Sequence, residues 1–251
     1  MELKRKPFQG IYNIIRFNWH FYLIAGLSLV SLVLIKQEFS DTVQIVIYWL
    51  VLLSSSTIII SLFASYYIYD LSDLYQITWL KDAENKKVLN IHAGFDETSR
   101  IIKYKFPNTD LKTGDFYNPK KHTELSIQRA RRTYPSSGNT IQVLTNNLPF
   151  SDESFDYSLA ILAAHEIRDE EERIRFLSEL NRITKSNGEI MVTEHLRDWN
   201  NFMAYTIGFF HFHSRVSWLR TFEKANLKVK EEIKTTAFIT TFILSRDGDT
   251  F

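Results

Sequence analysis

Two long apolar stretches, separated by a short polar connector, dominate the first 70 residues. The first covers residues 17–35, uncharged from residue 22 onward, and the second covers residues 43–69, which are uncharged throughout. A helix needs about 20 apolar residues to cross the hydrocarbon core of a bilayer, so both stretches qualify. The connector, residues 36–42, is short. We therefore expect an antiparallel transmembrane hairpin.

Basic residues set the expected orientation of this hairpin. Lys36 is the only basic residue of the connector, whereas four basic residues precede the first span: Lys4, Arg5, Lys6 and Arg16. The positive-inside tendency then puts both termini on the cytoplasmic side of an integral membrane protein with two spans. Residues 70–80 mix apolar and polar positions, which favours an interfacial helix or linker. Residues 1–80 thus form the expected N-terminal unit.

From residue 81 to residue 251 the pattern changes to short apolar runs that alternate with helical segments. The expected strands are 87–92, 110–114, 141–144, 155–162, 189–193, 227–232 and 238–245. Strands that alternate with helices predict an α/β domain with a doubly wound, mostly parallel, seven-stranded Rossmann-like sheet. Its last strand is expected to be antiparallel. Ligands of such sheets bind beyond the carboxyl ends of the strands.

Composition removes several functional classes. The net charge is +1, so the chain lacks the basic excess of a nucleic-acid binder. The chain contains no cysteine, which excludes disulfides, thiolate nucleophiles and cysteine-ligated metal centres.

Four segments of the second unit resemble the class I S-adenosylmethionine (SAM)-dependent methyltransferases, in particular their type 11-like domain. In chain order they are VLNIHAG at 88–94, GD at 114–115, LPFSDESFD at 148–156 and LNRITKSNG at 180–188. The first segment lies where the family has its glycine-rich loop. The resemblance covers nearly all of residues 86–246 and rests on the order and spacing of the four segments.

The resemblance implies SAM as cofactor and assigns residues to it. Asp115 would accept hydrogen bonds from the ribose hydroxyls, and Asn146 would replace the family's acid near adenine. The glycine-rich loop is degenerate, because Asn90, His92, Gly94 and Asp96 stand where the family has an acid and three glycines. Glycines there permit positive φ and close approach to the cofactor. We expect Asn90, His92 and Gly94 to contact SAM, while a decayed, non-binding loop is the alternative.

Two His/Glu dipeptides follow neighbouring strands of the predicted sheet. His165-Glu166 comes after the fourth strand and Glu194-His195 ends the fifth, so both should meet at the carboxyl edge. A hydrogen-bond network is the plain structural interpretation. A catalytic role as general base is the second, because imidazole titrates near neutral pH.

A metal site is the third interpretation of these residues. Imidazoles and one carboxylate suit a divalent ion such as Zn, Mn or Fe. The predicted ligand set is His165, Glu194, His195, His211 and His213. On a strand, His211 and His213 would point the same way, and on a helix they would diverge.

An aromatic insertion at 199–219 follows the fifth strand. Its apolar run, 202–212, is too short to span a bilayer but suits the lipid–water interface or the wall of an apolar pocket. We therefore expect a lipophilic small-molecule substrate and contact with membrane lipids. The resulting hypothesis is SAM-dependent O- or C-methylation of a membrane-resident molecule. A metal-dependent, non-methylating enzyme of the same fold and a catalytically silent, membrane-tethered binding module are the alternatives.

Overall fold

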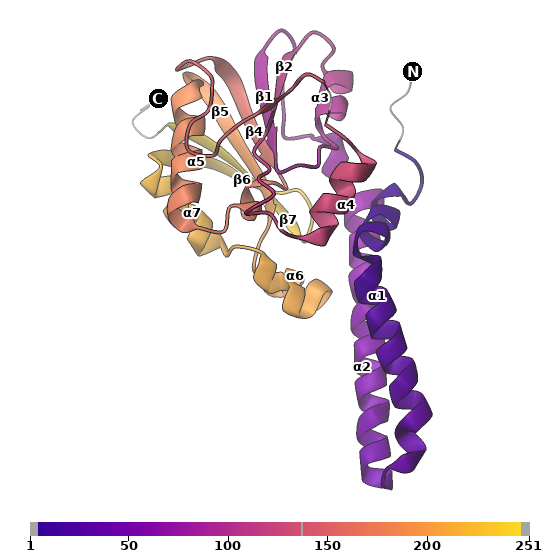
Figure 1. Cartoon of the computed structure of the whole chain (residues 1–251). Coiled ribbons are helices and arrows are strands. Elements are labelled where there is room, and N and C mark those ends of the chain that lie inside the picture. The colour runs from indigo at the N-terminus through magenta and orange to yellow at the C-terminus, as the bar shows by residue number, and fades with distance from the viewer. Residues whose placement is uncertain (1–4, 137, 247–251) are drawn as a thin grey trace.

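The computed structural model describes residues 5–136 and 138–246 and has an N-terminal helical hairpin beside an α/β domain (Figure 1). Lys4, one of the residues used for orientation, lies outside the described residues, as do 1–3 and 247–251. The helices are α1 Gln9–Ile35, α2 Asp41–Tyr66, α3 Ser99–Lys105, α4 Leu125–Thr133, α5 Glu170–Ile183, α6 Trp199–Tyr205 and α7 Arg215–Lys224. The strands are β1 Lys87–His92, β2 Asp110–Asp115, β3 Thr140–Gln142, β4 Phe155–Ile161, β5 Thr184–His195, β6 Leu227–Lys234 and β7 Ile239–Arg246.

The seven strands form one sheet in the order β3-β2-β1-β4-β5-β7-β6. All neighbours pair in parallel except β7, which is antiparallel to both β5 and β6. The predicted doubly wound sheet with an antiparallel closing strand is confirmed. The order reverses between β1 and β4, so the switch point lies at the carboxyl ends of these two strands.

Alternate residues of each central strand pack into cores on opposite faces of the sheet. Leu89 and Ile91 of β1 join one core with side chains of α5 and α7, whereas Val88 joins the other, with Ile102 of α3. This alternation follows from the pleat of a strand whose two faces are both covered. It holds the carboxyl edge of the sheet rigidly in place.

The two apolar stretches form a hairpin of long helices that projects from the α/β domain (Figure 1). α1 begins eight residues before the predicted span and kinks at Asn18, whose φ is −113° and whose amide donates to the Ile14 carbonyl. α2 begins at Asp41 and continues as a π-helical turn over Tyr67–Leu71. Both helices are long and apolar enough to cross a membrane.

Of the two interpretations of residues 70–80, the interfacial helix is wrong and the linker agrees with the structure. After a short 3₁₀ turn, Asp73–Gln76, the chain runs into the core, where Ile77, Trp79 and Leu80 are each at most 3 % exposed. These side chains pack with Val88 and other residues of the second core. Burial of three large apolar side chains outweighs the local preference for a helix.

Asp70 fastens the start of α1 to the end of the hairpin. Its carboxylate accepts hydrogen bonds from the backbone amides of Gly10 (2.7 Å) and Ile11 (2.8 Å). The N-cap residue Phe8 has a φ of 61° and makes no side-chain cap bond, so Asp70 supplies the cap from 60 residues away. A Cβ on Gly10 would lie 2.4 Å from the Cβ of Tyr69, so only glycine fits there.

The hairpin is also docked on the α/β domain through polar contacts. Arg129 of α4 donates to the Phe17 carbonyl (2.5 Å) and bonds His20 (2.7 Å), and Tyr134 donates to Asn13 (3.1 Å). Phe17 is buried against Phe95 and Tyr134. These contacts place α1 over the loop that follows β1.

Candidate active site

A cavity of about 1030 Å³ lies between the hairpin and the carboxyl edge of the sheet. Hairpin residues form one wall, among them Ile14, Phe21, Ile58 and Ser61. The opposite side comprises the loop after β1, the ends of β4 and β5, and residues 205–208 and 211–212 of the insertion. The cavity is therefore mainly apolar, with His and Glu side chains gathered at the sheet edge. Pockets of this kind are typical of small-molecule sites.

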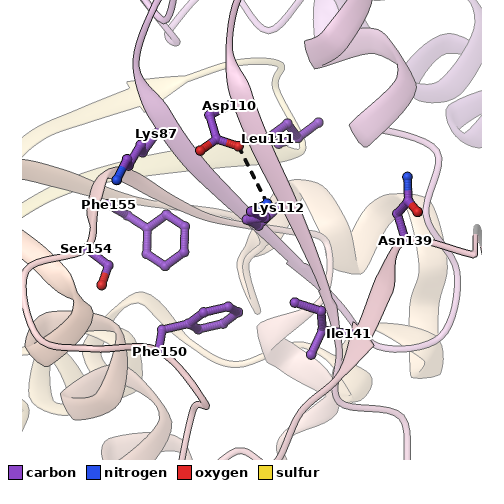
Figure 2. Close-up of a pocket in the computed structure, with 9 residues that line it drawn as sticks. All are labelled: Lys87, Asp110, Leu111, Lys112, Asn139, Ile141, Phe150, Ser154 and Phe155. Atoms are coloured by element: carbon purple, nitrogen blue, oxygen red, sulfur yellow. Dashed lines mark ion pairs between the residues drawn. The ribbon is translucent and has the colours of Figure 1, made fainter.

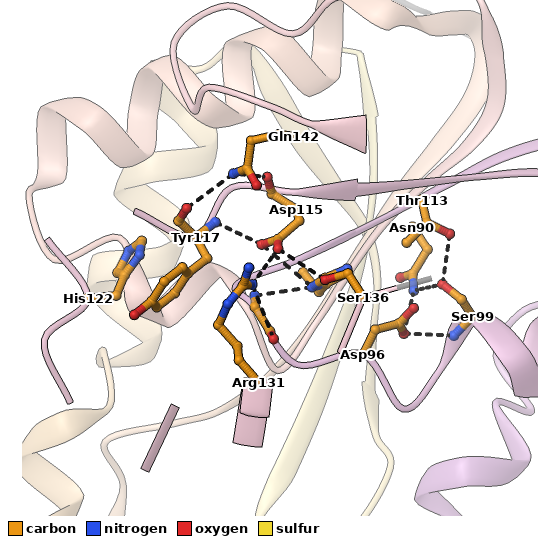
Figure 3. A network of polar contacts seen from close by, with 12 residues as sticks. Asn90, Asp96, Ser99, Thr113, Asp115, Tyr117, His122, Arg131, Ser136 and Gln142 are labelled. Carbon is orange, nitrogen blue, oxygen red and sulfur yellow. Dashed lines mark hydrogen bonds and ion pairs between the residues drawn. The ribbon is translucent and has the colours of Figure 1, made fainter. Parts of the chain in front are cut away.

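Asp115, the predicted ribose acid, ends β2 and is 2 % exposed (Figure 3). Its Oδ1 accepts from the Tyr117 amide (2.9 Å), and Arg131 Nη1 lies 2.5 Å from its Oδ2. The same guanidinium stacks on the Tyr117 ring and reaches the Gly94 carbonyl (3.4 Å). Arg131 thus covers both Asp115 and Gly94, an ion pair that no sequence motif indicates.

Gly94 and His92 shape the loop after β1. Gly94 has a φ of +96°, and a Cβ there would meet Arg131 at 2.9 Å, which explains the surviving glycine. The Gly94 amide donates to His92 Nδ1 (3.1 Å), so the proton of the neutral ring lies on Nε2. His92 lines the cavity, and its Nε2 has no hydrogen-bond partner among the described residues. Burial lowers the pKa of His92, which keeps the ring neutral.

Asn90, predicted to bind the cofactor, instead organises the turn into α3. Its amide donates to Thr98 Oγ1 (2.9 Å) and Ser99 Oγ (2.8 Å). Asp96 Oδ1 accepts from the backbone amides of Thr98 (3.0 Å) and Ser99 (2.9 Å), as Figure 3 shows in part. Asn90, at the position of the family's acid, and Asp96, at a glycine position, thus hold the loop to the start of the helix.

Asn146 lies apart from the cavity. It is exposed in the turn after β3, between the bridge partners Leu144 and Asn147. In the described part of the chain it is not among the residues that line the cavity. The predicted contact with adenine therefore gains no support from the geometry.

His165 and Glu194 form a buried pair at the ends of β4 and β5. His165 lies in a 3₁₀ turn, Ala164–Glu166, and its Nδ1 is 2.6 Å from Glu194 Oε2. Glu194 is fully buried, and its Oε1 accepts from the backbone amides of Ala163 and His165 (both 3.1 Å). Burial alone would lower the pKa of His165, but the carboxylates of Glu194 and Glu166 outweigh it and raise that pKa to about 10.

Glu166 stands between two imidazoles. Its Oε1 is 3.4 Å from Nε2 of His165 and 3.8 Å from Nε2 of His211. Burial would raise the pKa of Glu166, but these two histidines hold it well below its usual range. The three side chains all line the cavity.

His195 is held in a separate, neutral network. Asn201, fixed by Asp198 and the Phe238 carbonyl, presents its oxygen to Nδ1 (2.9 Å). Nδ1 therefore carries the proton, and Nε2 accepts from the Tyr69 hydroxyl at 3.0 Å. Burial lowers the pKa of His195 to about 4. The ring also stacks on Phe212 with centroids 4.6 Å apart.

The structure does not assemble the predicted five-residue metal set as one site: His165 contacts Glu194 and shares Glu166 with His211, whereas His195 and His213 are bonded elsewhere. Glu194 is occupied by three hydrogen bonds, and both nitrogens of His195 are bonded. His213 turns away and accepts from buried Arg173 at 3.2 Å. Burial and the nearby Arg173 lower the pKa of His213 to about 3. His211 and His213 point in different directions because the 3₁₀ turn Thr206–His211 ends between them, at Phe212.

A second pocket, of about 430 Å³, lies at the opposite edge of the sheet (Figure 2). Lys87, Asp110 and Phe155, which line it, are the first residues of β1, β2 and β4. Sites of doubly wound sheets lie at the other ends of the strands, so this pocket is set aside.

Comparisons with known proteins agree with this architecture. A methyltransferase-domain family model matches residues 122–192. A demethylmenaquinone methyltransferase of Thermotoga maritima is 32 % identical over 109 residues, which is 43 % of either chain. The present chain thus matches less than half the length of that curated relative.

Solved structures show the same fold. A SAM-dependent methyltransferase of Aquifex aeolicus superposes with a TM-score of 0.50 at 15 % identity, covering 69 % of this chain and 89 % of that one. The pyocyanin biosynthetic protein PhzM gives a TM-score of 0.50 at 12 % identity, covering 69 % of this chain and 54 % of its own.

The sheet, its switch point and these matches define the class: the α/β domain has the Rossmann-like fold of class I methyltransferases. Both sequence matches are to methyltransferases, one over residues 122–192 and the other over 109 residues.

Proposed function

We propose that the chain is a membrane-anchored enzyme that transfers a methyl group from SAM to oxygen or carbon of a hydrophobic, membrane-dissolved small molecule. The observation that carries this proposal is the cavity between hairpin and sheet, since one molecule there touches both the apolar hairpin and the His/Glu side chains. A lipid or quinone is the kind of acceptor that fits. The curated relative is named for a demethylated menaquinone, an acceptor of this kind.

The membrane arrangement follows from the hairpin and the insertion. α1 and α2 would cross the bilayer, and the basic residues before the first span would keep the α/β domain in the cytoplasm. α6 packs beside α2. In α6 and the 3₁₀ turn that follows it, four large apolar side chains are exposed: Trp199, Met203, Ile207 and Phe210. These suit the lipid–water interface, beside the cavity through which an acceptor would enter.

SAM fits the edge of the cavity next to the loop after β1. His92 lines the cavity and its buried Nε2–H has no partner among the described residues, and Gly94 lets the backbone approach. Asp115 would hold the ribose once Arg131 moves aside. When bound, SAM supplies an electrophilic methyl group on its sulfonium centre.

The His/Glu side chains would prepare the acceptor. In the metal-free protein His165 carries its proton at neutral pH, so its imidazolium can stabilise negative charge that develops on an acceptor oxygen. Glu166 is the ionised carboxylate beside it and keeps the imidazolium charged, and its own pKa lies too low for an efficient general base. His195 is buried and neutral, and its role is to join the sheet edge to Tyr69 of the hairpin.

A catalytically silent binding module is the second candidate function. One observation favours it: Arg131 forms an ion pair with Asp115, the carboxylate that would bind the ribose. Calorimetry of the full chain with SAM separates the two candidates, because a silent module with a closed site would take up no SAM.

Transfer of a labelled methyl group to an organic extract of native membranes tests the enzyme directly. In a matched pair of variants, Ile58→Trp fills the cavity, whereas Ile59→Trp alters an outward position that is 66 % exposed. We expect Ile58→Trp to lower transfer at least tenfold with SAM affinity unchanged, and Ile59→Trp to behave as wild type. Equal activity in both variants would contradict an acceptor in this cavity.

A further inference from the structure

We propose that His165, Glu166 and His211 bind one divalent transition-metal ion, of which Zn²⁺ is the first candidate. One ring nitrogen of each histidine and one carboxylate oxygen of Glu166 lie within 4.8 Å of one another. Two imidazoles and a carboxylate form a ligand set that Zn²⁺, Mn²⁺ and Fe²⁺ accept.

The spacing of these atoms matches a coordination sphere. With metal–ligand bonds of about 2.0–2.1 Å, two ligands of a tetrahedral ion lie about 3.4 Å apart. Glu166 Oε1 is 3.4 Å from His165 Nε2 and 3.8 Å from His211 Nε2. Two edges of the tetrahedron are therefore present to within a few tenths of an ångström.

An outer carboxylate orients the imidazole of His165, and a second carboxylate lies near the imidazole of His211, where it could accept once Arg168 has moved away. Glu194 accepts from Nδ1 of His165 at 2.6 Å, which directs the free Nε2 toward Glu166. Glu124 Oε1 lies 3.5 Å from Nδ1 of His211, on the side away from Glu166. Metal-bound histidines usually donate their second N–H to such a carboxylate. Glu194, predicted as a ligand from the sequence, is thus a positioning residue.

Arg168 is the group that an ion would displace. Its Nη2 contacts Nδ1 of His211 and lies 2.6 Å from Nε2 of the same ring, and Arg168 also donates to the His211 carbonyl. The Arg168 side chain is 43 % exposed, so it can swing into solvent. The metal ion would then take the place of the Arg168 guanidinium beside the carboxylates of Glu166 and Glu124.

Three protein ligands leave a coordination position open, and all three residues line the cavity. An acceptor hydroxyl bound there would lose its proton more easily, because the ion stabilises the resulting oxyanion. This role rests on the proposed function, whereas binding of the ion does not.

The full chain, purified in detergent with an affinity tag free of histidine, tests the site. After treatment with a chelator it is titrated with Co²⁺, whose visible absorption reports tetrahedral nitrogen and oxygen ligands, and with Zn²⁺ in competition. We expect one ion per chain. His211→Ala and Glu166→Gln should weaken binding at least tenfold, and Glu194→Gln by roughly 10–100-fold.

His213→Gln is the matched control, because His213 lies two residues from His211 but faces Arg173. It should bind the ion as wild type does. Binding of less than about a tenth of an ion per chain, or equal binding by His211→Ala and His213→Gln, would overturn the site. Calorimetry with SAM on the same samples keeps the two proposals apart: a protein that binds SAM and transfers methyl groups but takes up no ion would overturn this inference alone.

Discussion

The Arg131 guanidinium lies 2.5 Å from the Asp115 carboxylate and thereby covers the acid at the end of β2. A ligand that bonds this acid must first displace the arginine, which reduces its apparent affinity. We expect Arg131→Ala to tighten SAM binding by up to about tenfold, the equivalent of one charge-assisted hydrogen bond that no longer has to be broken.

Arg132→Ala is the control for this prediction, because Arg132 is the next residue along the chain and its side chain is exposed. Calorimetry on the full chain measures both variants. Weaker binding by Arg131→Ala would mean that the guanidinium contacts the bound ligand instead of competing with it.

His92 should donate to SAM through its unpartnered Nε2–H. Removing that hydrogen bond in His92→Ala should lower SAM affinity roughly three- to tenfold. His92→Gln, which keeps an N–H donor on a side chain of similar length, should restore part of the affinity. Asn146→Ala should bind as wild type does, because Asn146 is exposed away from the cavity. A loss in Asn146→Ala equal to that in His92→Ala would refute this assignment.

Asp70→Ala should loosen the hairpin. Two backbone amides, of Gly10 and Ile11, lose their acceptor, and caps of this kind contribute about 1–2 kcal/mol. We expect a lower Tm and faster proteolysis near the start of α1. Asp73→Ala, at an exposed position three residues on, should change neither. Identical proteolysis of the two variants would rule out the cap as a stabilising contact.

Acid should destabilise the protein partly through His195. Its pKa in the folded chain is about 4, below its ordinary value of 6.5. The unfolded chain therefore binds the extra proton first, and stability that is complete above pH 6.5 is lost as the pH falls toward 4. The loss amounts to at most about 3 kcal/mol.

His195→Gln should flatten the dependence of Tm on pH across this window, because a neutral amide does not titrate. Nearby Asp198 raises and His165 lowers the pKa of His195, so the comparison is made against wild type under identical salt. Parallel curves for the two proteins would show that His195 does not contribute to the pH dependence.

The sequence predicted the sheet and the hairpin because both depend on local apolar periodicity, as in β1 and α2. It failed at residues 77–80, where burial in the core overrode a mixed pattern. The metal set failed for a related reason. The directions of His211 and His213 depend on where one 3₁₀ turn ends. Tyr69 and His195 are 126 residues apart, so no local pattern could indicate their contact.

The segment that joins the hairpin to the sheet also limits how this chain can be divided. Ile68, Ile77, Trp79 and Leu80 are buried against the α/β domain, and Tyr69 holds His195. A truncated chain that begins at residue 81 would expose apolar surface on the sheet, leave His195 Nε2 without its donor and open one wall of the cavity. Exchange of the helical hairpin between related proteins would therefore succeed only if residues 67–80 remain with the sheet.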